Sequence, residues 1–146
     1  MEASPAKLLI LVLEGNPDHT RLIEDALNQN SGHRQIVAIA DGIQAMDFLH
    51  RRGEYVDAPR PNLILLDLNL PGKDGREILA EIKADPQLRR IPIVVLTTCA
   101  SEEDIFKSYT LQGNCYVIKS SEQAQLFGIV KRIEEFWLGI VTLSLE

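Results

Sequence analysis

The sequence lacks the features that mark several large classes of protein. Its 146 residues include only two cysteines, Cys99 and Cys115, which are too few for a disulfide framework or for a zinc site built from cysteines. No apolar run approaches the roughly 20 residues that span a bilayer, and the first residues do not resemble a secretory signal. We therefore expect a cytoplasmic chain that works in a reducing compartment and does not enter a membrane.

Positive charge is also scarce. The sequence has 15 lysine and arginine residues against 21 aspartate and glutamate residues, which gives a formal net charge of -6. A nucleic-acid-binding domain normally carries a basic surface, so we expect no nucleic-acid partner. The hydrophobic share of 45% and the charged share of 25% are ordinary for a globular chain, and the length suits one domain.

Short apolar runs alternate with amphipathic segments along the chain. The segments expected as strands are 7–13, 35–40, 62–67, 91–97 and 115–118. The segments expected as helices are 17–28, 42–51, 75–84, 101–111 and 122–137. Strands with almost no polar interruption indicate burial on both faces, as in a parallel sheet covered by helices. We predict a three-layer, doubly wound α/β fold.

Two further expectations concern the burial of particular side chains. Helical spacing places Ile43, Met46 and Leu49 on the inward face of the 42–51 segment. The three histidines do not have the spacing of metal ligands, so we expect them on the solvent-exposed surface. They are His19, His33 and His50.

Polar residues follow the apolar runs at the points where the strands are expected to end. Glu14 follows the first run, Asp67 the third and Lys119 the fifth, while the fourth ends in Thr97 and Thr98. Ligands of such folds bind beyond the carboxyl ends of the strands, which meet at one edge of the sheet. Carboxylates suit a divalent cation and an ammonium suits a phosphoryl group. The set therefore predicts a site for both.

Each of these residues also has an ordinary explanation when taken alone. Asp67 could cap a helix, Lys119 could be a solvated surface lysine, and Thr97 could be a β-branched strand residue. Asp74 stands directly before the 75–84 helix and already supplies its N-cap. The joint pattern at four strand ends is more specific than any one member.

Three motifs resemble the receiver domain of two-component response regulators. They are LLDLNLPGKDGRE at 65–77, IPIVVLTT at 91–98 and CYVIKS at 115–120. More narrowly, the chain resembles the single-domain regulators that partner cyanobacterial phytochromes. That likeness rests on RRGEYVDAPRPNLILLDLNLP at 51–71, IKADPQLRRIP at 82–92, NCYVIKS at 114–120 and IEEFWLGIVTL at 133–143. The resemblance implies a flavodoxin-like, five-stranded sheet of order 2-1-3-4-5. It also implies one receiver domain over 1–146 with a C-terminal extension at 138–146.

The resemblance also implies a role for each polar residue. Asp67 would be the phosphoacceptor, which attacks the phosphohistidine of a sensor histidine kinase, here one of phytochrome type. Lys119 would pair with one phosphoryl oxygen, and the Thr97 hydroxyl would donate to another. Tyr116 matches the switch aromatic whose rotamer follows Thr97.

The implied metal site departs from the family pattern. Mg²⁺ would be held by Glu14, the Asp67 carboxylate and the Asn69 carbonyl, but the second acid of the usual pair is replaced by Gly15. Losing this carboxylate should reduce Mg²⁺ affinity and also reduce repulsion around the phosphoacceptor. Asp18 is a possible substitute, although its position in the first turn suits the helix dipole better. Two interpretations stay open: a working phosphoacceptor with a weakened metal site, and a degenerate receiver that binds partners without phosphorylation.

Partner surfaces are implied by the same resemblance. We expect a homodimer through the fourth and fifth helices and the fifth strand, and signalling through protein–protein contacts. The candidate contact residues are Ile105, Tyr109, Tyr116, Phe127 and Phe136.

Enzymes of the same fold class fit less well. A flavodoxin-like carrier needs a loop rich in hydroxyls and glycine after the first strand, and GNPDHT at 15–20 is poor in both. An aspartate-nucleophile phosphatase needs a second acid two residues later, where Asn69 stands. We therefore expect a signalling protein rather than an enzyme.

Overall fold

The computed structural model describes residues 8–28, 34–110, 115–120 and 122–140, and in them five parallel strands form one sheet. The strand order β2-β1-β3-β4-β5 confirms the predicted α/β class and the order implied by the resemblance. The bounds are β1 Leu8–Leu13, β2 Arg34–Ile39, β3 Leu63–Leu66, β4 Ile93–Thr97 and β5 Cys115–Ile118.

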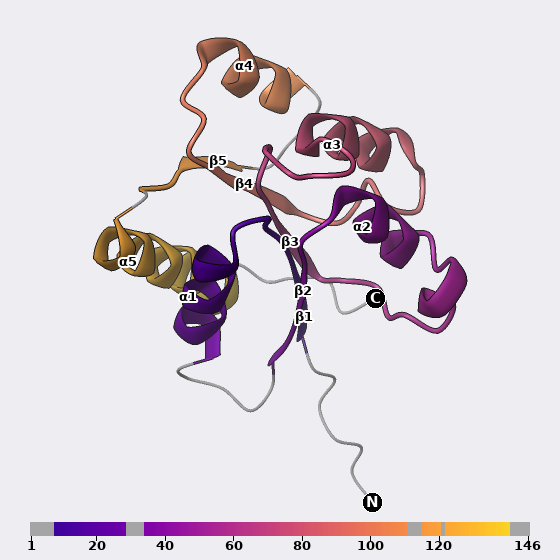
Figure 1. Cartoon of the computed structure of the whole chain (residues 1–146), viewed down its shortest axis with the longest axis horizontal. Helices are drawn as coiled ribbons and strands as arrows, with labels where there is room; N and C mark the ends of the chain where they lie inside the picture. Colours follow the sequence, from indigo (N-terminus) through magenta and orange to yellow (C-terminus); the bar gives the residue numbers. More distant parts are fainter. Residues whose placement is uncertain (1–7, 29–33, 111–114, 121, 141–146) are drawn as a thin grey trace, which may run out of the picture.

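Helices cover both faces of the sheet (Figure 1). Helices α1 and α5 pack together on one face, and α2 and α3 lie on the other, while α4 contacts β5. No helix in the described ranges is long and apolar enough to cross a membrane. The bounds are α1 Pro17–Asn28, α2 Gly42–Leu49, η1 Gly53–Tyr55, α3 Gly75–Ala84, α4 Glu102–Thr110, α5 Gln123–Glu134 and η2 Glu135–Ile140.

Side chains along each strand alternate between two hydrophobic cores. On β1, Leu9, Leu11 and Leu13 join the core beneath α2 and α3. Ile10 and Val12 join the core beneath α1 and α5. Each fully buried side chain of this kind stabilises the fold by about 1.5–3 kcal/mol relative to exposure. Burial on both faces explains why these strands show no polar alternation.

The predicted elements agree with the structure at most boundaries. The bounds of α1, α3 and β5 are those predicted, and the other strands and helices up to α4 differ by one or two residues at an end. The last helix differs more, because α5 ends at Glu134 and a π-helical segment continues over Glu135–Ile140. Of the extension expected at 138–146, the part up to 140 belongs to η2. Residues 141–146 lie outside the described residues.

The prediction for the inward face of α2 is wrong at one position. Ile43 is 56% exposed. A Cβ atom on Gly42 would lie 2.0 Å from the Lys73 carbonyl oxygen, so α2 packs against this backbone through Gly42. Positions three, four and seven residues further on share that face, which turns Ile43 to solvent. The other buried residues of α2 are Ala45, Met46, Phe48 and Leu49.

Helix α4 buries fewer of its described side chains than the other α-helices. Of its described side chains only Ser108 is buried. Phe106 is 73% exposed and Tyr109 is 52% exposed. Few buried contacts mean that α4 depends on particular polar contacts for its position.

The start of α3 packs directly on the loop that follows β3. A Cβ atom on Gly75 would lie 2.4 Å from the Asp67 carbonyl oxygen and 2.6 Å from the Leu68 Cα. Both contacts are with backbone atoms, so only glycine fits without displacing the loop. Gly128, inside α5, is the opposite case, because a Cβ atom there would meet nothing within 4 Å.

We predict opposite effects of alanine at these two glycines. Gly75→Ala lowers the free energy of unfolding by about 1–3 kcal/mol, because overpacking has to move the loop that carries Asp67. Gly128→Ala raises it by about 0.5–1 kcal/mol, because alanine is the better helix former. Urea unfolding followed by circular dichroism measures both. A neutral Gly75→Ala variant would contradict the packing of α3 on this loop.

Candidate functional site

Four polar residues that follow or end strands meet at one edge of the sheet. Glu14 follows β1, Asp67 follows β3, Lys119 follows β5, and Thr97 ends β4. Backbone hydrogen bonds continue past the strand ends, from the Asp67 N–H to the Leu13 carbonyl (2.9 Å) and from the Lys119 N–H to the Thr97 carbonyl (2.8 Å). This register brings the four side chains together, and none of the four residues is more than 6% exposed.

The Lys119 ammonium lies at the centre of this cluster. Its Nζ donates to Glu14 Oε1 at 2.5 Å and to Asp67 Oδ2 at 2.9 Å. The third contact of Nζ is His19 Nδ1 at 3.0 Å. An ammonium has three N–H donors and no acceptor, so all three protons have a partner. Two carboxylates around one ammonium leave the site with a net negative charge.

The second carboxylate oxygen of Asp67 is held by the following loop and by β4. Oδ1 accepts from the Asn69 N–H at 2.9 Å and from the Thr97 hydroxyl at 3.0 Å. Burial raises the pKa of Asp67, but the hydrogen bonds from Asn69, Lys119 and Thr97 outweigh it and bring the pKa below its ordinary value. Asp67 is therefore an ionised carboxylate at neutral pH, which is the form that a carboxylate nucleophile needs.

For Glu14 the effects on the pKa balance in the opposite direction. Burial raises the pKa of Glu14 above its ordinary value, the hydrogen bond from Lys119 opposes this, and the charge of Asp67 adds to it. Its Oε2 accepts from the Asn16 N–H at 3.1 Å. Asp67 is thus the more acidic of the two carboxyl groups that share Lys119.

The surface location expected for His19 is wrong. His19 is 9% exposed and contacts the Lys119 ammonium. The sequence held a signal for this burial, because His19, Ile23 and Ala26 stand at helical spacing and all three are buried. Because Lys119 only donates, His19 Nδ1 is the acceptor and the ring is neutral. Burial and the Lys119 charge lower the pKa of His19, in agreement. Of the other histidines, His50 is half-buried and His33 lies outside the described residues.

An open cleft of about 490 Å³ leads to the cluster. Its wall includes Glu14, Asp67 and Asn69, whose carboxylate and carbonyl oxygens are the donors that Mg²⁺ prefers. Gly15 also lines it, and a Cβ atom there would lie 3.7 Å from the Asn69 carbonyl oxygen. Asp18 does not line this cleft but faces a separate hollow beside α5.

The donor set therefore fits a hard cation only in part. Within the described ranges, no three His, Cys, Asp or Glu side chains are grouped as a metal site would need. Gly15 adds no side-chain donor to this wall, and Asp18 faces a different hollow.

Residues 10–131 match the family model of the response regulator receiver domain. The chain belongs to this receiver family. It is 51% identical over 142 residues to the response regulator Rcp1 of Synechocystis sp., and the match covers 97% of this chain and 96% of that protein. The resemblance seen in the sequence motifs is confirmed.

Solved structures agree with the family assignment. The phosphorylated cyanobacterial phytochrome response regulator RcpA matches with a TM-score of 0.91 and 55% identity, over 94% of this chain and 99% of that chain. The Mn²⁺-bound form of Rcp1 matches with a TM-score of 0.91 and 50% identity, over the same shares. The flavodoxin-like receiver fold is therefore shown.

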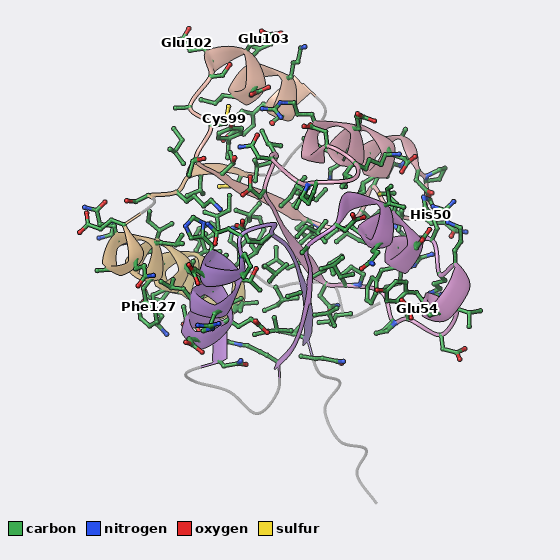
Figure 2. The ribbon with its side chains drawn as sticks, viewed as in Figure 1. His50, Glu54, Cys99, Glu102, Glu103 and Phe127 are labelled. Atoms are coloured by element: carbon green, nitrogen blue, oxygen red, sulfur yellow. The ribbon has the colours of Figure 1, made fainter. Side chains whose placement is uncertain are left out.

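A second polar network in this receiver connects the loop after β4 to α3, α4 and β5. Arg76 donates to both oxygens of Asp104, with Nε–Oδ1 2.8 Å and Nη2–Oδ2 2.7 Å. The Cys99 thiol also donates to Asp104 Oδ2, at 2.9 Å, and Figure 2 shows Cys99 beside α4. The Tyr116 hydroxyl donates to the Cys99 carbonyl at 2.7 Å. Burial, with smaller contributions from Cys99 and Asp104, raises the pKa of Tyr116 to about 12, so the hydroxyl stays protonated.

We predict that the Arg76–Asp104 pair makes stability depend on pH. The hydrogen bonds from Arg76 hold the pKa of Asp104 well below its usual range, so this stabilisation is present above the unfolded-state pKa and is lost as the pH falls. Asp104→Asn costs about 1 kcal/mol at pH 7, as for a well-formed surface pair. Urea unfolding between pH 7 and pH 3 should show a smaller loss for the variant than for the wild type. Parallel curves would contradict the pairing.

Proposed function

We propose that the chain is a single-domain response regulator that accepts a phosphoryl group on Asp67 from a sensor histidine kinase of phytochrome type. The observation that carries this is the ionised Asp67 carboxylate that lines the cleft, held by Lys119 and Thr97. The kinase type rests on the likeness to RcpA. The proposed place of action is the cytoplasm.

The chemistry is the transfer of a phosphoryl group from a donor to the Asp67 carboxylate. An Asp67 carboxylate oxygen forms a bond to phosphorus, the bond from phosphorus to the donor nitrogen or oxygen breaks, and the donor departs with that electron pair. Negative charge then grows on the phosphoryl oxygens beside Asp67. The Lys119 ammonium and the Thr97 hydroxyl are both already within hydrogen-bond distance of Asp67 and supply donors for these oxygens.

Glu14, Asp67 and the Asn69 carbonyl are the residues that would hold Mg²⁺. When bound, the cation supplies charge that offsets repulsion between the carboxylate and the phosphoryl group. Because Gly15 adds no carboxylate, the site binds Mg²⁺ more weakly than a receiver with the usual acid pair. Lys119 supplies part of the positive charge that a tightly bound cation would bring, since it pairs with both Glu14 and Asp67.

The signal passes from Asp67 to the α4 side of the protein. Thr97 contacts Asp67, its Oγ1 accepts from the Cys99 N–H at 3.3 Å, and Tyr116 binds the Cys99 carbonyl. A phosphoryl group that recruits the Thr97 hydroxyl therefore alters the loop that carries Cys99. Thr97 and Tyr116 act as the switch pair.

A homodimer forms through the face made by α4, β5, the end of α5 and the start of η2. Exposed apolar side chains gather on these elements, with Ile118 and Phe136 each 49% exposed. An apolar hollow of about 290 Å³ lies between β5 and the end of α5, lined by Val117 and Trp137 among others. Of the contact residues expected from the sequence, Tyr109 and Phe136 are exposed, and three are half-buried. The half-buried ones are Ile105, Tyr116 and Phe127.

We predict phosphorylation of Asp67 by a small acyl-phosphate donor. Incubation with acetyl phosphate and Mg²⁺ should add one phosphoryl group, seen by intact mass, and EDTA should slow the gain by about tenfold or more, as for loss of one strong electrostatic contribution. Asp67→Asn should gain nothing. Asp18→Asn, altered outside the cleft, should match the wild type. No gain in a folded wild-type chain would favour a phosphorylation-independent binding module instead.

Gly15→Asp tests the weakened metal site in the same assay. The added carboxylate should lower the Mg²⁺ concentration for half-maximal rate by about tenfold, because a unit charge near a cation contributes on the order of 1 kcal/mol or more. A Cβ atom at this position lies 3.0 Å from Pro71 Cδ, so the ring must shift slightly. An unchanged Mg²⁺ requirement would contradict the assigned position of the metal.

We predict that the dimer depends on the exposed apolar side chains of the α4, β5 and α5 face. Ile118→Lys and Phe136→Lys should each shift the chain to monomer, because a buried unpaired ammonium opposes association. Sedimentation equilibrium, with and without acetyl phosphate, measures the shift. Val56→Lys is the matched control, since Val56 is 63% exposed but lies after η1. A wild-type chain that is monomeric in both conditions would overturn the dimer.

A further inference from the structure

The contact between His19 and Lys119 is not used by the transfer chemistry described so far. Lys119 is 4% exposed, and its three protons point to Glu14, Asp67 and His19. Two of these acceptors are carboxylates and the third is a neutral ring nitrogen. His19 comes from the first turn of α1, a hundred residues from Lys119 in the chain, and it also lines the cleft.

The three acceptors differ in how readily each can lose its hydrogen bond from Lys119. A carboxylate attracts the ammonium through a full opposite charge, whereas the neutral ring nitrogen offers only a lone pair, so the bond to His19 is the weakest of the three. When a phosphoryl oxygen arrives, Lys119 has to exchange one acceptor for it. Losing the hydrogen bond to the neutral acceptor costs least. The Lys119 proton in that bond already points toward the cleft wall that carries His19.

We propose that His19 is a positioning residue for phosphoryl transfer. Its neutral Nδ1 accepts a hydrogen bond from one N–H of Lys119 until the incoming phosphoryl oxygen replaces it as the acceptor. This inference rests on the proposed function of Asp67. Without an acceptor at position 19, the third proton of a nearly fully buried ammonium has no protein partner, and Lys119 turns further toward Glu14 or Asp67. The ammonium is then displaced from the place where the phosphoryl group needs it.

Two substitutions of His19 separate hydrogen bonding from packing. His19→Leu keeps an apolar body but removes the acceptor. His19→Asn offers Oδ1 near the place of Nδ1 and so keeps the acceptor. His50→Asn is the matched control, because His50 ends α2 and lies beside that helix, away from α1 (Figure 2).

The rate of Asp67 phosphorylation by acetyl phosphate at saturating Mg²⁺ is the first measurement. We expect His19→Leu to be slower than the wild type by about tenfold, the effect of one hydrogen bond to a charged group. His19→Asn should return to within about twofold of the wild type, because it keeps the acceptor. His50→Asn should not change the rate. Urea unfolding of each variant confirms that the compared chains are folded.

Nitrogen NMR of the imidazole rings is the second measurement, and only three histidines have to be assigned. His19 should be neutral with its proton on Nε2, and its Nδ1 signal should move when beryllofluoride occupies the phosphoryl position. A proton on Nδ1, a Leu variant as fast as the wild type, or an Asn variant as slow as the Leu variant would each overturn the role of His19. A wild-type chain that takes up no phosphoryl group would overturn the proposed function itself.

Discussion

The buried ammonium of Lys119 between two carboxylates is the interaction on which the site depends. Burying an isolated carboxylate is costly, and Glu14 and Asp67 are both nearly inaccessible to solvent. One cation compensates both, and it does so only because β1, β3 and β5 end at the same level of a parallel sheet. Removing Lys119 would leave two adjacent buried charges without compensation. The fold and the chemistry are therefore linked through one side chain.

In the proposed metal site, Gly15 stands where the family pattern has a second acid, and the loss of that charge would change the electrostatic balance around the Lys119 ammonium. With only Glu14 and Asp67 present, a single ammonium neutralises half of the carboxylate charge, and less attraction remains for a divalent cation. The same loss leaves Asp67 with fewer negative neighbours to repel an incoming phosphoryl group. Under the proposed function, the site would thus lose part of its affinity for the metal and also part of the repulsion that the metal has to offset. The neutral His19 in the third position on Lys119 adds no charge of either sign to this balance.

Much of the fold followed from local patterns. Apolar runs without polar alternation identified the strands, and proline or acidic N-terminal positions located α1 and α3. The four residues at the strand ends were predictable because a parallel sheet brings all carboxyl ends to one edge. The contact partners of these residues were harder to predict. The contact from His19 to Lys119 joins elements distant in sequence, and His19 was wrongly expected at the surface. Its helical spacing with Ile23 and Ala26 held a signal for burial, but nothing local identified Lys119 as its neighbour.

The error at Ile43 has a different physical cause. A helix with apolar residues on more than one side could bury any of several faces. The closest backbone approach decides which face is buried. In α2 that approach is made by Gly42 against Lys73. Such a contact depends on the loop that follows β3, which local periodicity does not describe.

Helix α4 shows how a small change at Asp67 can reach a surface. Its apolar contacts are few, and its position depends on Asp104, which Arg76 and the Cys99 thiol bind from outside the helix. Cys99 belongs to the loop directly after Thr97, and its carbonyl also receives the Tyr116 hydroxyl. An element held by a few polar contacts has a low free energy of local rearrangement, so it responds when one of them shifts. Helices α1 and α3 each bury several side chains, so under the proposed function the exposed aromatic side chains of α4 are the part of the receiver that a phosphoryl group on Asp67 would reposition.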